Sequence, residues 1–206
     1  MAFTEPVVSR HPLGLPPGSV RAVLSLIIAG LFWTLLLLPD EKQIPIPLFL
    51  YFCTALVLLF FFAHGNSIRY EDGQSSPWGL PRGTFRFLLV AGTAAVFGLH
   101  YYLHQTLPLA KLVPRHEQLS QWPNLLIALG GGLGFGWLVG RGPWRKSAVF
   151  MDIQAWVSFL AMLGLTIEIV VLLFVNRNLK EDLKIDLSMW ECVLTGIVAW
   201  YFGARS

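Results

Sequence analysis

Charged residues are scarce in this chain. Asp, Glu, Lys and Arg make up 13% of its 206 residues, whereas hydrophobic residues make up 55%. A soluble domain typically carries about 25% charged residues. Because so few charges cannot cover a folded surface with polar groups, part of that surface must face an apolar environment. The shortage argues against an ordinary soluble domain and indicates a membrane protein.

Cysteine and catalytic motifs are also rare. The two cysteines, Cys53 and Cys192, lie at different places in two apolar runs, so we expect them at different depths and unpaired. There is no CxxC pair, no Ser/His/Asp set and no pair of carboxylates at one expected depth. We therefore expect no enzyme activity, no catalytic residue, no metal and no cofactor.

A basic stripe is missing too. The net charge is +3, but the basic residues are scattered between apolar runs. This pattern disfavours nucleic acid as a partner and is typical of topogenic charge beside membrane spans. The expected partners are the lipid bilayer and either further copies of this chain or other membrane subunits.

Long apolar runs are what the sequence does contain. A helix that crosses the hydrocarbon core needs about 20 apolar residues. Six runs approach this length, and the last is the shortest: Val20–Leu38, Ile44–Ala63, Phe85–Leu103, Trp122–Val139, Ile153–Val175 and Ser188–Phe202. They predict an all-α integral membrane protein with six transmembrane helices in a single membrane domain.

The loops predict an orientation. Six spans would place nine basic residues on the side of the two termini and six on the other side, which also holds most of the acidic residues. The excess of Lys and Arg marks the cytoplasmic side of a membrane protein. We therefore expect both termini in the cytoplasm.

An internal repeat accompanies the runs. Residues 12–24 read PLGLPPGSVRAVL and residues 77–89 read PWGLPRGTFRFLL, and a looser start, GPWRKS, stands at 142–147. We interpret these as three divergent two-helix hairpins, about 13–67, 78–142 and 143–206, behind a cytoplasmic tail at 1–12.

The repeated start has a local interpretation. Ser19 and Thr84 are placed to cap the following helix by accepting a backbone N–H. Arg21 and Arg86 follow two residues later and are candidates for contact with lipid phosphate at the cytoplasmic leaflet. Binding of one specific anionic lipid or ligand by these arginines is the alternative.

The start GLPPGSVR and the end WYFGARS resemble those of small prokaryotic two-helix membrane segments, some of them holin-like. The resemblance covers two helix starts and the last few residues, and it implies no chemistry. It implies a location in the cytoplasmic membrane of a prokaryote.

Glu168 is the most informative polar residue, because it lies well inside the fifth run. A carboxylate in a membrane costs at least about 2.5 kcal/mol on insertion scales and usually faces a bundle interior or an aqueous cavity. Three interpretations stay open: an ion or proton path, a hydrogen bond that holds helices together, or a shallower position at the outer interface. Thr34 and His100, with the neighbouring Tyr101 and Tyr102, are the expected partners of Glu168.

His100 and His104 are spaced by four but lack a third ligand of clear spacing, so we interpret them as interfacial histidines. A glycine-rich run predicts a helix-packing face, within the chain or between subunits. Its candidate residues are Gly130, Gly132, Gly134 and Gly136.

Two loops carry amphipathic patterns. Asn178–Leu187 has three leucines spaced by four, which predicts a short interfacial helix or an extension of the neighbouring helix. The loop His104–Gln121 is amphipathic in a looser way.

Two functions remain in view. The first is an oligomeric membrane protein that forms a pore, channel or small transporter, with Glu168 on its path. The second is a non-catalytic structural or accessory subunit of a larger membrane complex, which the scarcity of intramembrane polar residues favours.

Overall fold

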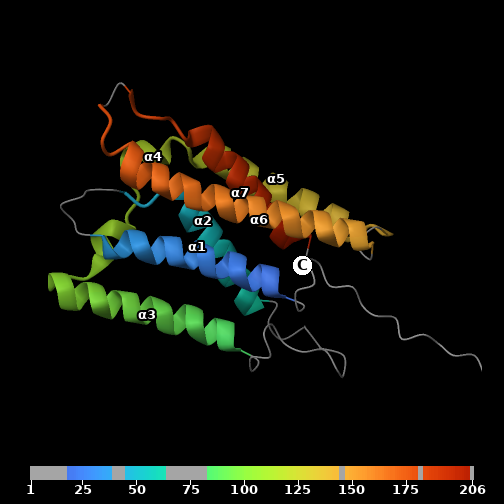
Figure 1. The fold of residues 1–206 in the computed structure, drawn as a ribbon, viewed down its shortest axis with the longest axis horizontal. Helices are drawn as coiled ribbons and strands as arrows, with labels where there is room; N and C mark the ends of the chain where they lie inside the picture. The colour runs from blue at the N-terminus through green and yellow to red at the C-terminus, as the bar shows by residue number, and fades with distance from the viewer. Residues whose placement is uncertain (1–17, 39–44, 64–82, 144–146, 181–182, 205–206) are drawn as a thin grey trace, which may run out of the picture.

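The computed structural model describes residues 18–38, 45–63, 83–143, 147–180 and 183–204, and all the regular secondary structure within these ranges is helical (Figure 1). Six longer helices run side by side and are joined by two short helical turns and a π-helical extension. The elements are α1 Ser19–Leu37, α2 Leu48–Ala63, α3 Thr84–His104, η4 Pro108–Leu112, α4 His116–Leu119, α5 Trp122–Gly140, α6 Ala148–Val170, η6 Val171–Val175 and α7 Ser188–Gly203.

Four of these helices are long and apolar enough to cross a membrane: α1, α3, α5, and α6 continued through η6. The second and sixth runs form helices of 16 residues each. At 1.5 Å per residue such a helix measures about 24 Å, which is shorter than a hydrocarbon core of about 30 Å. The all-helical prediction is therefore confirmed, whereas six complete spans are not.

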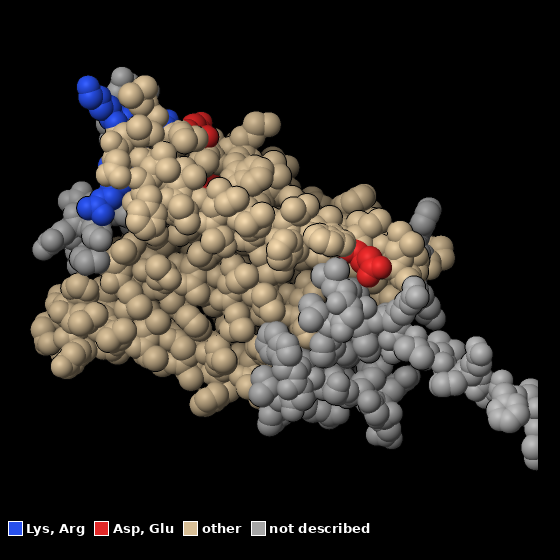
Figure 2. All heavy atoms as spheres, in the orientation of Figure 1, with Lys and Arg blue, Asp and Glu red and all other residues tan. Residues whose placement is uncertain are grey.

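The surface of the bundle is strongly apolar. Large side chains such as Phe87, Ile127, Val149 and Met189 are each at least 67% exposed. On the face shown in Figure 2, charged side chains gather toward the ends of the helices, and the surface between them is uncharged. A continuous apolar surface of this kind is compatible with a lipid environment.

Helix packing does not follow the predicted hairpins throughout. α1 packs against α2, and α6 packs against α7, as two of the hairpins require. The helices of the middle hairpin, α3 and α5, make no substantial interface: α3 packs on α1, and α5 forms the largest interface of the bundle with α7. Three equivalent hairpins are thus not confirmed, and the repeat stays a prediction.

The two matching helix starts share one backbone geometry. Gly18 and Gly83 precede α1 and α3 with φ of 85° and 89°, in the left-handed region that favours glycine. The predicted side-chain caps are wrong, because Ser19 and Thr84 are the first helical residues and neither cap has a side-chain hydrogen bond. The buried Ser19 hydroxyl has no hydrogen-bond partner among the described residues.

Prolines set the start of α2. The helix begins at Leu48, after Pro45 and Pro47, so these prolines precede it and do not lie in its first turn. Proline disfavours the helical conformation of the residue before it, which explains why the helix starts later than the apolar run.

The segment between α3 and α5 closes one end of the bundle. The Lys111 ammonium group donates to the carbonyls of Leu36 and Leu38, at the C-terminal end of α1. The Tyr51 hydroxyl of α2 donates to the Lys111 carbonyl at 2.9 Å, and the Gln118 amide donates to the Ile46 carbonyl at 3.0 Å. These bonds satisfy carbonyl groups near the ends of helices.

The loop between α6 and α7 lies at the same end (Figure 1). Its predicted interfacial helix is wrong: the described residues of 178–187 form turns and extended chain, with one 3-10 residue at Leu183. Asn176 fixes the loop instead. Its side chain donates to the Ile185 carbonyl at 2.9 Å and accepts from the Ile185 N–H at 3.0 Å. We call this part of the molecule the loop end.

Candidate functional site

Glu168 lies on the buried face of α6. It shares this face with Gln154, Ser158 and Leu165, which follow one another at helical spacing. The Glu168 side chain is 1% exposed, and neither carboxyl oxygen has a hydrogen-bond partner among the described residues. Glu168 therefore faces the bundle interior, and within the described part of the chain no hydrogen bond joins helices through its carboxyl group.

A second carboxyl group approaches Glu168 from α7. Glu191 is buried in the first turn of α7, and its carboxyl group interacts electrostatically with that of Glu168. Gly164 explains why the two helices come so close, since a Cβ atom there would lie 2.8 Å from Leu194 Cδ2 and 3.1 Å from the Trp190 ring. This electrostatic interaction between two carboxyl groups was not expected from the sequence.

The thiol of Cys53 is the third member of the cluster. Cys53 of α2 is 1% exposed and interacts electrostatically with Glu168. Cys53 of α2 and Glu191 of α7 therefore both lie within electrostatic range of Glu168 of α6. We call these three residues the carboxyl cluster.

The carboxyl cluster lies toward the loop end. Glu168 follows the start of α6 by 20 residues, or about 30 Å of helix, and precedes Val175 by about 10 Å. Glu191 stands three residues after the start of α7. The expectation that Glu168 lies past the middle of its span is consistent with this position.

The helix changes its winding three residues after Glu168, where α6 ends at Val170 and η6 begins at Val171. Residues Val171–Val175 are π-helical, and the Asn176 N–H donates to the Val171 carbonyl at 2.8 Å. π-helical segments are rare and occur frequently at functional sites. The irregular turn therefore marks this part of α6 independently of its carboxyl group.

A third acidic residue, Asp186, lies in the loop just before α7. Its exposed carboxylate accepts the Ser188 N–H at 2.9 Å at the start of α7. Hydrogen bonds from the backbone and the side chain of Ser188 lower the pKa of Asp186 from its ordinary value of 3.8. Asp186 interacts electrostatically with Glu191 in turn.

The predicted partners of Glu168 lie elsewhere. The exposed Thr34 hydroxyl donates to the Gly30 carbonyl of its own helix at 2.7 Å. His100 is buried, but its Nδ1 lies 3.0 Å from the Thr106 carbonyl, and its ring lies 4.6 Å from that of His104. Neither residue hydrogen-bonds to Glu168, and Tyr101 and Tyr102 are exposed.

The described part of the chain offers the histidine pair no third metal ligand. Among the described residues, no group of three or more His, Cys, Asp and Glu side chains is arranged to hold a metal ion.

The two arginines of the repeated start lie in different surroundings. The guanidinium of Arg21 lies 4.7 Å from the centre of the Phe60 ring, across the α1–α2 interface. This cation–π contact ties Arg21 to the protein. Arg86 is half-buried in the first turn of α3. Lipid binding by either residue stays a prediction.

The glycine-rich helix divides into two faces. Gly132 and Gly136 meet the backbone of α7 at Gly196 and Trp200, where an added Cβ atom would collide with a carbonyl oxygen. Gly130 and Gly134 have nothing within 4 Å of the position of a Cβ atom. The predicted packing surface is thus present within the chain for two glycines, and the other two are open.

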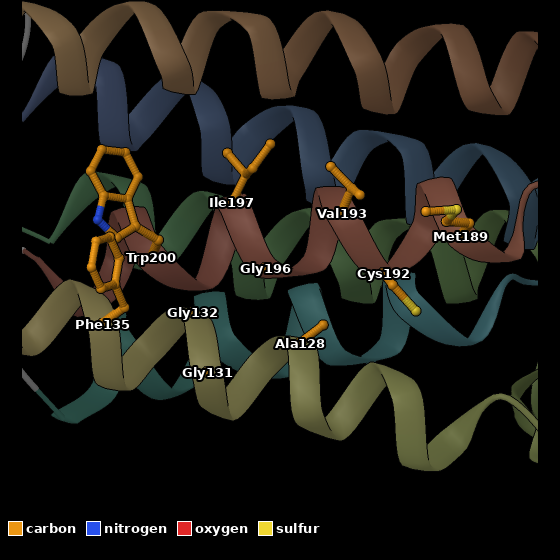
Figure 3. A pocket seen from close by; sticks show the side chains of 10 residues that line it. All are labelled: Ala128, Gly131, Gly132, Phe135, Met189, Cys192, Val193, Gly196, Ile197 and Trp200. Atoms are coloured by element: carbon orange, nitrogen blue, oxygen red, sulfur yellow. The ribbon is translucent and has the colours of Figure 1, made fainter.

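An apolar groove of about 560 Å³ follows the seam between α5 and α7 (Figure 3). Phe135 and Trp200 lie at one end and Met189 at the other. A second hollow continues it toward the loop end and adds the polar side chains Gln121 and Asn124. Glu168 lines neither of them.

Sequence reasoning missed Glu191 because it stands near the start of the sixth run, where an acidic residue is ordinary at a helix N-terminus. Its position three residues into an apolar helix was the available signal. Cys53 carried no signal, because nothing in its own run indicates which helix lies opposite. The buried Gln154, whose side-chain nitrogen has no partner among the described residues, was recognisable as a polar residue within an apolar run.

Comparison with protein-family models, with curated proteins and with solved structures finds no significant match to this chain.

Proposed function

We propose that this chain is a small membrane transporter or channel, with Glu168 on the path of the transported ion. One observation carries the proposal: a carboxyl group that is 1% exposed and without a hydrogen-bond partner among the described residues interacts electrostatically with a second buried carboxyl group. A buried polar group without a partner costs about 1–3 kcal/mol, and more when it is charged. Such a group in an apolar helix is by default a candidate for function.

The surroundings of Glu168 support an ionic role over a structural one. α2 and α7 contain no Lys or Arg, so the helices that bring Cys53 and Glu191 to it supply no counter-charge. The single charged residue of α1, Arg21, lies over the ring of Phe60. A carboxyl group whose purpose was to hold helices together would have a donor as its partner.

The proposal includes a location in the cytoplasmic membrane of a prokaryote, with both termini in the cytoplasm. The four apolar helices are compatible with a membrane protein. The excess of Lys and Arg on the side of the termini supports cytoplasmic termini, and the resemblance of the helix starts supports a prokaryotic cytoplasmic membrane. In this arrangement α2 and α7 are the short members of six crossing helices, and the loop end faces outward.

Ion flux into liposomes tests this function. The purified chain is reconstituted, and dyes sensitive to protons, sodium and potassium follow flux driven by a gradient of each ion. The account expects flux of one ion in wild type and loss of flux in Glu168→Gln. Asp152→Asn is the matched control, because Asp152 is an exposed carboxylate on the same helix. Absence of flux for every ion in wild type would contradict the proposal.

A packing subunit of a larger membrane complex is the second candidate. The open glycines Gly130 and Gly134 and the apolar groove favour it, since small residues let another helix approach closely. Purification in mild detergent, with the mass of the complex and the identity of every co-purifying chain, separates the two. A closed homo-oligomer supports the transporter, whereas other subunits in fixed ratio support the packing subunit.

A further inference from the structure

Three carboxyl groups form a series from the loop end into the bundle. Asp186 is exposed in the loop, Glu191 is 8% exposed in the first turn of α7, and Glu168 is 1% exposed in α6. Each interacts electrostatically with the next. Burial therefore increases stepwise along a continuous series of groups that each hold one exchangeable proton.

We propose that Glu168 and Glu191 form a proton-binding carboxyl pair that exchanges protons with the loop end through Asp186. This proposal depends on the transport function above and names the proton as its substrate.

The composition of the site favours a proton over a metal cation. Calcium takes 6–8 oxygen ligands, and magnesium requires nearly octahedral coordination. Among the described residues no cluster of three or more His, Cys, Asp and Glu side chains could hold a metal ion. A proton needs only one oxygen atom, and protonation of one of the two buried carboxyl groups removes the like-charge repulsion between them.

The other titratable groups around the pair are accounted for. From α2, Cys53 interacts with Glu168, while Tyr51 donates its hydroxyl to the Lys111 carbonyl. From α7 come Glu191, which is the only charged residue of this helix, and the thiol of Cys192, which interacts electrostatically with Glu191. From α1, Arg21 lies over the Phe60 ring. No basic side chain is thus shown to compete with a proton for the two carboxyl groups among the described residues.

The transfer balances within the pair. Neither oxygen of Glu168 has a hydrogen-bond partner among the described residues, so the transfer passes through water. The O–H bond of the carboxylic acid breaks as a water molecule takes up its proton, and that water releases another of its protons to form the O–H bond on the carboxylate of the other residue. Asp186 exchanges protons with Glu191 on one side and with water at the loop end on the other. The close approach of α6 and α7 at Gly164 brings the two carboxyl groups together.

Infrared spectroscopy of the full chain in detergent micelles tests this pair without requiring transport. The carbonyl stretch of a protonated carboxyl group is followed as pH is varied, and its shift in D2O reports proton exchange. We expect a band from a buried acid that is lost in Glu168→Gln and whose titration midpoint shifts in Glu191→Gln. We expect slower exchange in Asp186→Asn and no change in Asp152→Asn.

Glu168→Asp provides a second variant that keeps the carboxyl group, so a band that returns there shows that loss in Glu168→Gln is not a failure to fold. A band unchanged in both glutamine variants would overturn the pair. A titration midpoint of Glu168 that is the same in wild type and in Glu191→Gln would also overturn the proposed pair. A coupled titration together with no flux in liposomes supports the pair but contradicts the transport function. Proton flux without a coupled titration supports transport but contradicts the pair.

Discussion

Glu168 of α6 and Glu191 of α7 interact electrostatically across a helix interface in which neither carboxyl oxygen of Glu168 has a hydrogen-bond partner among the described residues. Two acidic groups of like charge in an apolar surrounding oppose the stability of the bundle. Helix packing at Gly164 nevertheless holds them together. An arrangement that costs stability and is specified by close packing is typical of a functional site.

Replacement of Glu168 by methionine should stabilise the protein. Methionine has a similar length and removes a buried polar group that has no partner among the described residues. We expect the free energy of unfolding to stay unchanged or to rise by about 1–3 kcal/mol. Thermal unfolding in one detergent, followed by circular dichroism, measures this change. A clear loss of stability would show that Glu168 holds the helices together.

The two faces of α5 should respond differently to alanine. In Gly132→Ala the new Cβ atom meets the Gly196 carbonyl oxygen and lies 2.9 Å from Ala199 Cβ. We expect destabilisation by about 1–3 kcal/mol, as for other overpacked interfaces. Gly134→Ala is the matched control, because nothing lies within 4 Å of its Cβ position. If Gly134→Ala changes the mass of the purified complex, the open face of α5 is an interface with another chain.

Removal of the Asn176 side chain should free the loop between α6 and α7. Asn176→Ala deletes two hydrogen bonds to the backbone of Ile185, each with a net contribution of about 0.5–1.5 kcal/mol. We expect faster amide hydrogen exchange at Ile185 and its neighbours, with little change in α1 and α3. Exchange measured by mass spectrometry on the detergent-solubilised protein tests this. Unchanged exchange at Ile185 would contradict the role given to Asn176.

The pKa of Asp186 should lie below its ordinary value of 3.8, because Ser188 donates hydrogen bonds to the charged form of the carboxyl group. Its contribution to stability is complete above its unfolded pKa and is lost as pH falls through its lower folded pKa. Ser188→Ala removes the side-chain bond and should move the midpoint partway back toward 3.8. The carboxyl carbon signal of Asp186 in NMR spectra measures both midpoints. Equal midpoints in wild type and variant would contradict the contribution of the Ser188 hydroxyl.

The sequence predicted the helices well and their partners poorly. Apolar runs locate a helix because length and composition are local properties of the sequence. Five of the six helices begin within about four residues of the predicted position, and α6 begins five residues before Ile153. Which helices touch depends on side-chain shape across the interface. The fit of Gly132 and Gly136 against α7 decides the α5–α7 pairing, and a repeat in the sequence does not contain that information.

The candidate site shows the same division. Glu168 was recognisable because one charged residue in a long apolar run is unusual. Glu191 was hidden, because an acidic residue near the start of a run is also what a loop boundary or a helix N-terminus favours. Only the packing of α6 on α7 shows that it is buried beside Glu168.

The central claim is that Glu168 serves ion movement at the expense of stability, and one variant measured in two ways tests it most directly. Purified wild-type protein and Glu168→Gln are compared for proton flux into liposomes and for thermal unfolding in detergent, with Asp152→Asn as control. The account predicts that Glu168→Gln loses flux while its stability is unchanged or higher. Retained flux together with reduced stability would contradict it and would assign Glu168 to helix packing.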